Sequence, residues 1–105
     1  MTHPEPRTAA WYRNRLIDFS VPEHDHDGLI RWLTEGLAPG SFLTAVLSND
    51  LREACARADP INQTALCRIV RFLANDAPLG SWGSAREVEY WYATHQARRA
   101  ASETP

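Results

Sequence analysis

The chain has 105 residues, of which 44% are hydrophobic and 10% aromatic, and its formal net charge is −2. This length suits a single domain with one core, and the apolar content excludes an intrinsically disordered chain. The net negative charge disfavours a duplex-DNA-binding protein, because neutralisation of phosphates supplies much of that affinity.

The two ends of the chain, residues 1–7 and 101–105, are polar and contain proline. We expect flexible termini around one helical domain over residues 8–100. The N-terminal end lacks the apolar core of a signal peptide, and no apolar run reaches the roughly 18 residues needed to span a bilayer. We therefore predict a cytoplasmic protein with no membrane partner. The first helix is expected from about Thr8 to Phe19.

The second predicted helix follows an acidic segment. Ser20 and Glu23 have the spacing of a capping box, and Asp27 offers a later start. Apolar residues three or four apart then give this helix one apolar face. Gly36 is expected to end the helix in the left-handed conformation.

The third predicted helix begins after a Pro-Gly pair, where Ser41 can act as its cap. It holds no charge before Asp50, which predicts the most buried element of the fold. Asp50 can then cap a further helical turn. The apolar stripe of the third helix is Phe42, Leu43, Val46 and Leu47.

Two further helix starts are clear. Asp59 followed by Pro60 combines a capping residue with the residue favoured at the first helical position. A loop is expected over residues 75–80, and Ser84 with Glu87 forms a capping box that opens the last helix. Strand-type alternation occurs nowhere in the sequence. We therefore predict an all-α fold, a compact single domain of five or six short helices.

The cysteines and histidines offer little chemistry. Cys55 and Cys67 fall in separate predicted helices, and two buried, reduced thiols are favoured over a disulfide in a cytoplasmic protein. His24 and His26 could ligate a metal together with a third residue, but they lack the i,i+4 spacing typical of helical zinc sites. A solvated acidic entry to the second helix is the favoured interpretation.

A catalytic constellation is not evident in the sequence. Nucleophilic catalysis needs a nucleophile, a base and an orienting group, and phosphate binding often uses a glycine-rich loop after a strand. His95, which lies far from the other histidines, continues an apolar stripe and is expected to be packed. We predict a protein that is not an enzyme, with no cofactor, no metal and no small-molecule substrate.

Binding surfaces are more plausible, because arginine beside an exposed aromatic suits single-stranded nucleic acid. The alternative is a solvated face whose charge is neutralised by neighbouring carboxylates. The acidic segment over residues 20–38 is an opposite surface, which could dock on an arginine-rich partner or imitate nucleic acid. The candidate binding residues are Arg68, Arg71, Arg86, Tyr90, Arg98 and Arg99.

A helix-turn-helix over residues 51–73 is a second possibility. Its recognition helix would span residues 60–74. The junction lacks the glycine-containing turn that is often seen, and the overall charge is unfavourable. Residues of base-reading type on the expected outer side are Asn62, Gln63, Arg68 and Arg71.

The segment from Leu29 to Ser84 resembles a family of short phage- and prophage-encoded proteins. The resemblance implies a fold and a type of genome, but it carries over no catalytic residue. Accessory phage proteins of this size commonly act on host machinery, and anti-CRISPR proteins are among them. The matching pieces are Pro39-Gly40-Ser41-Phe42-Leu43, Ala45-Val46-Leu47, Asn49-Asp50-Leu51, Ala58-Asp59 with Asn62, and Trp82-Gly83-Ser84.

The resulting expectation is a non-enzymatic, anti-CRISPR-like phage protein that acts in the host cytoplasm. Its partner is either a host defence effector complex or the single-stranded DNA that the effector exposes. The alternative is a phage regulator that binds DNA through the helix-turn-helix-like pair.

Overall fold

The computed structural model describes residues 7–103, apart from the side chain of Glu103. Over this range the chain forms six α-helices and one 3-10 helix, without a strand, and the all-α prediction is confirmed. The elements are α1 (Ala9–Asp18), η1 (Glu23–Asp25), α2 (His26–Glu35), α3 (Ser41–Leu47), α4 (Leu51–Arg57), α5 (Pro60–Asp76) and α6 (Ala85–Glu103).

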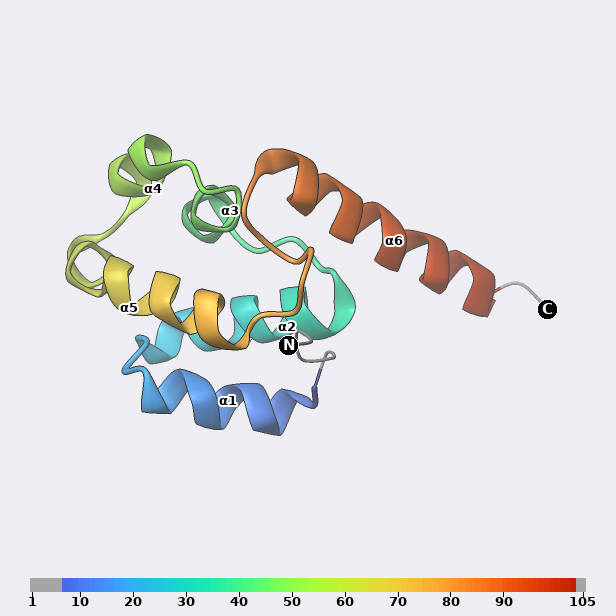
Figure 1. Cartoon of the computed structure of the whole chain (residues 1–105), viewed down its shortest axis with the longest axis horizontal. Coiled ribbons are helices and arrows are strands. Elements are labelled where there is room, and N and C mark those ends of the chain that lie inside the picture. The colour runs from blue at the N-terminus through green and yellow to red at the C-terminus, as the bar shows by residue number, and fades with distance from the viewer. Residues whose placement is uncertain (1–6, 104–105) are drawn as a thin grey trace.

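The helices form a body from which the last helix projects. Helix α1 packs against α2 and α5, and α3 packs against α4. Figure 1 shows α6 leaving this body, with its C-terminal end far from the other helices. The molecule measures 46 × 28 × 26 Å, and its elongation reflects the projecting helix.

Most of the predicted helix caps are present. The carboxylates of Asp50 and Asp59 each accept a hydrogen bond from a backbone N–H in the first turn of α4 and α5, at 3.2 and 2.8 Å. The Ser84 hydroxyl accepts from the backbone N–H of Glu87 at 3.1 Å, as the capping box requires. Gly36 ends α2 with φ of 67°, in the predicted left-handed conformation. These caps explain where the chain starts and stops its helices.

Ser20 does not cap the second helix, although the capping-box spacing predicts that it would. It has φ of 58°, and its backbone N–H donates to the carbonyl of Ile17 at 2.9 Å. The next N–H, of Val21, donates to the carbonyl of Leu16 at 3.0 Å. Ser20 therefore closes α1 and does not cap α2, which begins at His26 after the 3-10 turn. Ser41 likewise is the first residue of α3, whose cap is Gly40.

The core is centred on Trp32 of α2. Its side chain is fully buried, and its indole N–H donates to the Ser81 carbonyl at 2.7 Å. Tyr12 and Phe72 meet edge to face within the same core, with ring centroids 6.5 Å apart. Five of the seven residues of α3 are buried, so this uncharged helix is the central element that its composition predicts. Those residues are Phe42, Leu43, Ala45, Val46 and Leu47.

The prediction of buried thiols is wrong. Cys55 and Cys67 are both free and exposed. Helix α4 turns Ala54 toward the core, and Ala58 just beyond its end is also buried, so Cys55 lies on the outer side. Cys67 lies on the outer side of α5, whose buried stripe includes Ile69. The cysteines thus contribute little to the core.

Helix α6 runs to Glu103, three residues beyond the predicted domain boundary at residue 100. At the other end, the Arg7 backbone N–H donates to the Tyr12 hydroxyl at 3.2 Å, so this residue of the predicted flexible end is held against α1. The rest of the predicted flexible termini, residues 1–6 and 104–105, lies outside the described residues. Among the described helices, α6 included, none has the length together with the apolarity that crossing a membrane requires.

Candidate functional site

The six predicted binding residues are divided between two helices. Arg68 and Arg71 are exposed on α5, and the other four belong to α6. Two of the guanidinium groups bind backbone carbonyls: Arg68 Nε donates to the Ser20 carbonyl at 3.1 Å, and Arg99 Nη1 donates to the Glu35 carbonyl. These two arginines therefore hold the ends of α1 and α2, and Arg99 is only partly exposed, with its Nη2 buried.

The α6 residues do not form one stripe. Arg86 and Tyr90 are one helical turn apart on the outer side, and the Tyr90 side chain is 73% exposed. Arg98 follows Tyr90 by eight residues, which places it about 80° round the helix. Glu87 and Glu89 lie between Arg86 and Tyr90 in sequence. The arginine–aromatic combination is thus local to Arg86 and Tyr90.

The helix-turn-helix interpretation requires Asn62 on the outer side of α5, and this placement is wrong. Asn62 is only 5% exposed, because the Asp59 carboxylate caps its backbone N–H and the side chain turns toward Asp25. The neighbouring Gln63 side chain donates to the Ala58 carbonyl at 3.3 Å. Asn62 is therefore not available to read a base edge.

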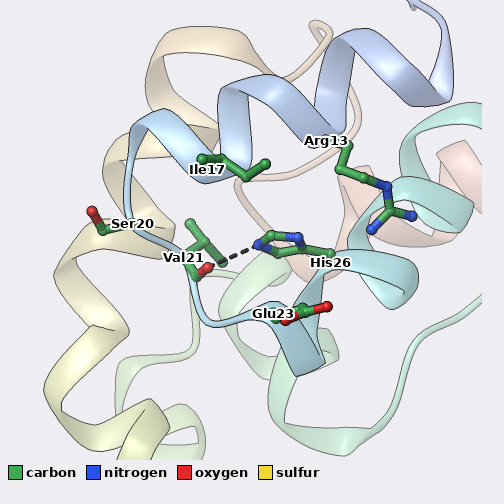
Figure 2. A pocket seen from close by; sticks show the side chains of 6 residues that line it. All are labelled: Arg13, Ile17, Ser20, Val21, Glu23 and His26. Carbon is green, nitrogen blue, oxygen red and sulfur yellow. Dashed lines mark hydrogen bonds between the residues drawn. The ribbon is translucent and has the colours of Figure 1, made fainter.

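A hollow of about 420 Å³ opens between α1 and the segment that leads into α2. Figure 2 shows the His26 ring between Ile17 and Arg13 of α1 on one side and Glu23 of η1 on the other. The size is typical of small-ligand or side-chain pockets. The lining residues are Arg13, Ile17, Ser20, Val21, Glu23 and His26.

His26 forms the floor of this hollow. Its side chain is 4% exposed, and Nε2 lies 2.8 Å from the Val21 carbonyl. Because a carbonyl only accepts, Nε2 carries the hydrogen, and Nδ1 of the neutral ring is left as an acceptor. Nδ1 is buried and has no hydrogen-bond partner among the described residues. A buried acceptor without a donor is unfavourable.

The charged side chains that line the hollow are Arg13 and Glu23. Arg13 Nη2 pairs with the Asp27 carboxylate at 2.8 Å, and this hydrogen bond lowers the pKa of Asp27 below its ordinary value. Glu23 is exposed and has no ion-pair partner within residues 7–103. The charged lining residues, Arg13 and Glu23, carry opposite formal charges, and Asp27 beside Arg13 also lies near Arg31.

A second polar cluster lies where η1 meets the start of α5. Asp25 is buried, and this burial raises the pKa of its carboxyl above the ordinary value. Asp25 Oδ2 and Asn62 Oδ1 are both buried without a partner in the described structure. His24 Nε2 lies 3.6 Å from Asp25 and 3.5 Å from Asp59.

Neither histidine arrangement suggests a metal centre. His26 directs Nε2 to a carbonyl, whereas His24 is exposed and faces two carboxylates. In the part of the chain that the structure describes, no group of three His, Cys, Asp or Glu residues is placed to hold a metal ion. We therefore describe the start of α2 as an acidic segment and not as a metal centre.

Sequence reasoning identifies the acidic segment but misses the hollow. The acidic side chains are visible in the sequence, whereas Arg13 and Ile17 reach His26 only through the packing of α1 on α2. Comparisons with family models, with curated proteins and with solved structures each found no match to this chain. A proposal of function therefore rests on the chain's own residues and geometry.

Proposed function

We propose that this chain is a non-enzymatic, phage-encoded anti-defence protein of the anti-CRISPR kind, which inhibits a host effector by binding its protein surface. The observation that carries the proposal is the hollow between α1 and the start of α2, with the Glu23 carboxylate exposed and unpaired at its edge. Effectors that hold nucleic acid need basic surfaces. An unpaired carboxylate beside a recess can pair with a basic side chain on such a surface.

The same geometry favours a protein partner over single-stranded DNA. A strand-binding groove needs a continuous basic track with aromatic platforms. Here Arg68 and Arg99 also serve backbone carbonyls on different helices, and the exposed pair of Arg86 and Tyr90 lies beside two glutamates. The net charge of −2 weakens any phosphate contact further.

The proposal is tested in a bacterial strain whose CRISPR system targets a phage. Expression of the chain is expected to restore plaque formation. The purified effector complex of that system, after nuclease treatment, is then expected to co-elute with the chain at physiological salt.

Two outcomes contradict this proposal. One is the absence of restored plaques against every CRISPR type tested. The other is a shift of single-stranded DNA that weakens steeply with salt, combined with no co-elution of the nuclease-treated effector.

A further inference from the structure

A histidine and two carboxylates meet where η1 approaches the start of α5. His24 and Asp25 belong to η1, and Asp59 is the capping residue of α5. His24 Nε2 lies 3.6 Å from Asp25 Oδ1 and 3.5 Å from Asp59 Oδ2. One ring nitrogen therefore lies between two acidic groups that come from different elements of the fold.

Both carboxylates are held in place. The Asp59 carboxylate caps α5 by accepting a hydrogen bond from the backbone N–H of Asn62 at 2.8 Å, and the Asp25 side chain is buried. Burial raises the pKa of Asp25, the charge of His24 opposes this rise, and the charge of Asp59 adds to it. When both carboxylates are ionised they therefore repel each other across the junction.

His24 is the group through which the junction acquires a positive charge. Among the described residues, no arginine forms an ion pair with Asp25 or Asp59. His26 also faces Asp25, but its ring is buried and one of its nitrogens contacts a backbone carbonyl. Asn62, the other neighbour of Asp25, is uncharged. The half-exposed His24 ring, in contrast, can exchange a proton with solvent.

The charge of His24 decides the sign of the interaction. A neutral imidazole leaves the two carboxylates without a compensating cation, whereas an imidazolium attracts both of them. Histidine side chains change charge between about pH 5 and pH 8. We infer that protonation of His24 fastens η1 to the first turn of α5, so that this junction is held more firmly at mildly acidic pH than at pH 8.

This pH-sensitive junction lies next to the wall of the hollow. Ser20, Val21 and Glu23 line the hollow, and the segment that contains them leads directly into the junction. The same segment is also attached to α5 by the hydrogen bond from Arg68 Nε to the Ser20 carbonyl at 3.1 Å. Neither of these two groups changes charge in this pH range, so loosening at pH 8 is confined to η1. The inference does not depend on the proposed function.

The test is a double-mutant cycle on the full chain with His24→Gln and Asp59→Asn, since asparagine preserves the helix cap. Denaturant unfolding gives the folding equilibrium constants of the four proteins at about pH 5.5 and about pH 8, on either side of the histidine titration. The two residues should be coupled by about twofold or more at the lower pH, as for an ion pair near the surface, and uncoupled at the higher pH. Coupling of equal size at both pH values, or none at the lower one, would overturn the inference.

Glu89→Gln is the matched control, because it removes an exposed carboxylate from α6 that forms no ion pair with His24 among the described residues. In a cycle with His24→Gln it should show no coupling at either pH. Coupling as large as that of Asp59→Asn would mean that the overall charge, and not the junction, is responsible, and it would contradict the inference.

Hydrogen exchange tests the location of the effect. The His26 backbone N–H donates to the Glu23 carbonyl and closes η1. At the lower pH this amide should exchange about twofold faster in His24→Gln than in the native chain, and at the higher pH the two rates should agree. An exchange rate that does not respond to His24→Gln at the lower pH would contradict the fastening of η1.

Discussion

Gly36 lies directly against the side chain of His95, and this contact joins the end of α2 to α6. A Cβ placed on Gly36 would be 2.3 Å from His95 Cβ, closer than any real contact of this kind. One turn earlier on α6, the Trp91 indole N–H donates to the Trp32 carbonyl at 2.8 Å. Helix α6 is thus attached to the core helix through two consecutive turns.

Gly36→Ser is expected to destabilise the protein by about 2 kcal/mol or more, because its φ of 67° is strained for a side chain and the new Cβ meets His95. Denaturant-induced unfolding measures the loss. Gly40→Ser is the control: a Cβ at this position would meet nothing within 4 Å beyond its chain neighbours, and serine suits a helix cap. A similar loss in both variants would contradict the account of Gly36.

Trp91→Phe should lower the free energy of unfolding by about 1 kcal/mol, because it removes the donor to the Trp32 carbonyl. The loss is measured by the same unfolding experiment. Trp11→Phe should lower the free energy of unfolding by less, since the Trp11 indole nitrogen has no hydrogen-bond partner among residues 7–103. Equal losses would show that ring size, and not the hydrogen bond, dominates at Trp91.

Asp25→Asn is expected to raise the free energy of unfolding at neutral pH by about 1 kcal/mol, because it replaces a carboxyl whose charged form is disfavoured by burial with a neutral amide. Burial raises the pKa of the native Asp25 carboxyl, so the folded state binds more protons than the unfolded state between the two pKa values. Asp25 therefore makes stability fall as pH rises from the ordinary carboxyl pKa through the raised one. The variant should lose this dependence.

Asp27→Asn provides the opposite control. Arg13 lowers the pKa of Asp27, so its contribution is present above the ordinary carboxyl pKa and is lost as pH falls through the lowered one. Melting temperatures recorded from acidic to neutral pH should show the two variants deviating from the native chain in opposite directions. Deviations of the same sign would contradict the assignment of either carboxyl.

Both cysteine thiols should react with a thiol reagent in the native state, because Cys55 and Cys67 are free and exposed. Replacing both with serine should change the free energy of unfolding by less than about 0.5 kcal/mol, as for other surface changes. The number of thiols that react without denaturant checks the first expectation. Protection of either thiol until the protein unfolds would contradict its exposed placement.

Local signals make much of the fold predictable. Asp59 with Pro60, Asp50 and Gly36 each fix a helix end through the residues next to them, and each acts as predicted. The prediction for Ser20 is wrong because its conformation is set by hydrogen bonds back to α1, which the capping spacing does not reveal. Local pattern thus locates most helix ends, and at Ser20 the local hydrogen bonds that end α1 override the capping spacing.

The candidate site is less predictable, because it depends on how the helices pack against one another. The acidic residues before α2 can be identified in the sequence. The hollow, in contrast, forms only because Arg13 and Ile17 of α1 lie next to His26. The exposure of Cys67 and the burial of Asn62 likewise depend on which side of α5 meets the core. Residue type alone favours the reverse of both placements.

Co-elution of the chain with a nuclease-treated effector complex, from the CRISPR system against which it restores plaques, is the most direct test of binding to a protein surface. We predict a stable complex at physiological salt with the native chain and with Glu89→Gln, and a weaker one with Glu23→Gln. Restored plaques without any co-elution, or co-elution only while nucleic acid is intact, would contradict the central claim.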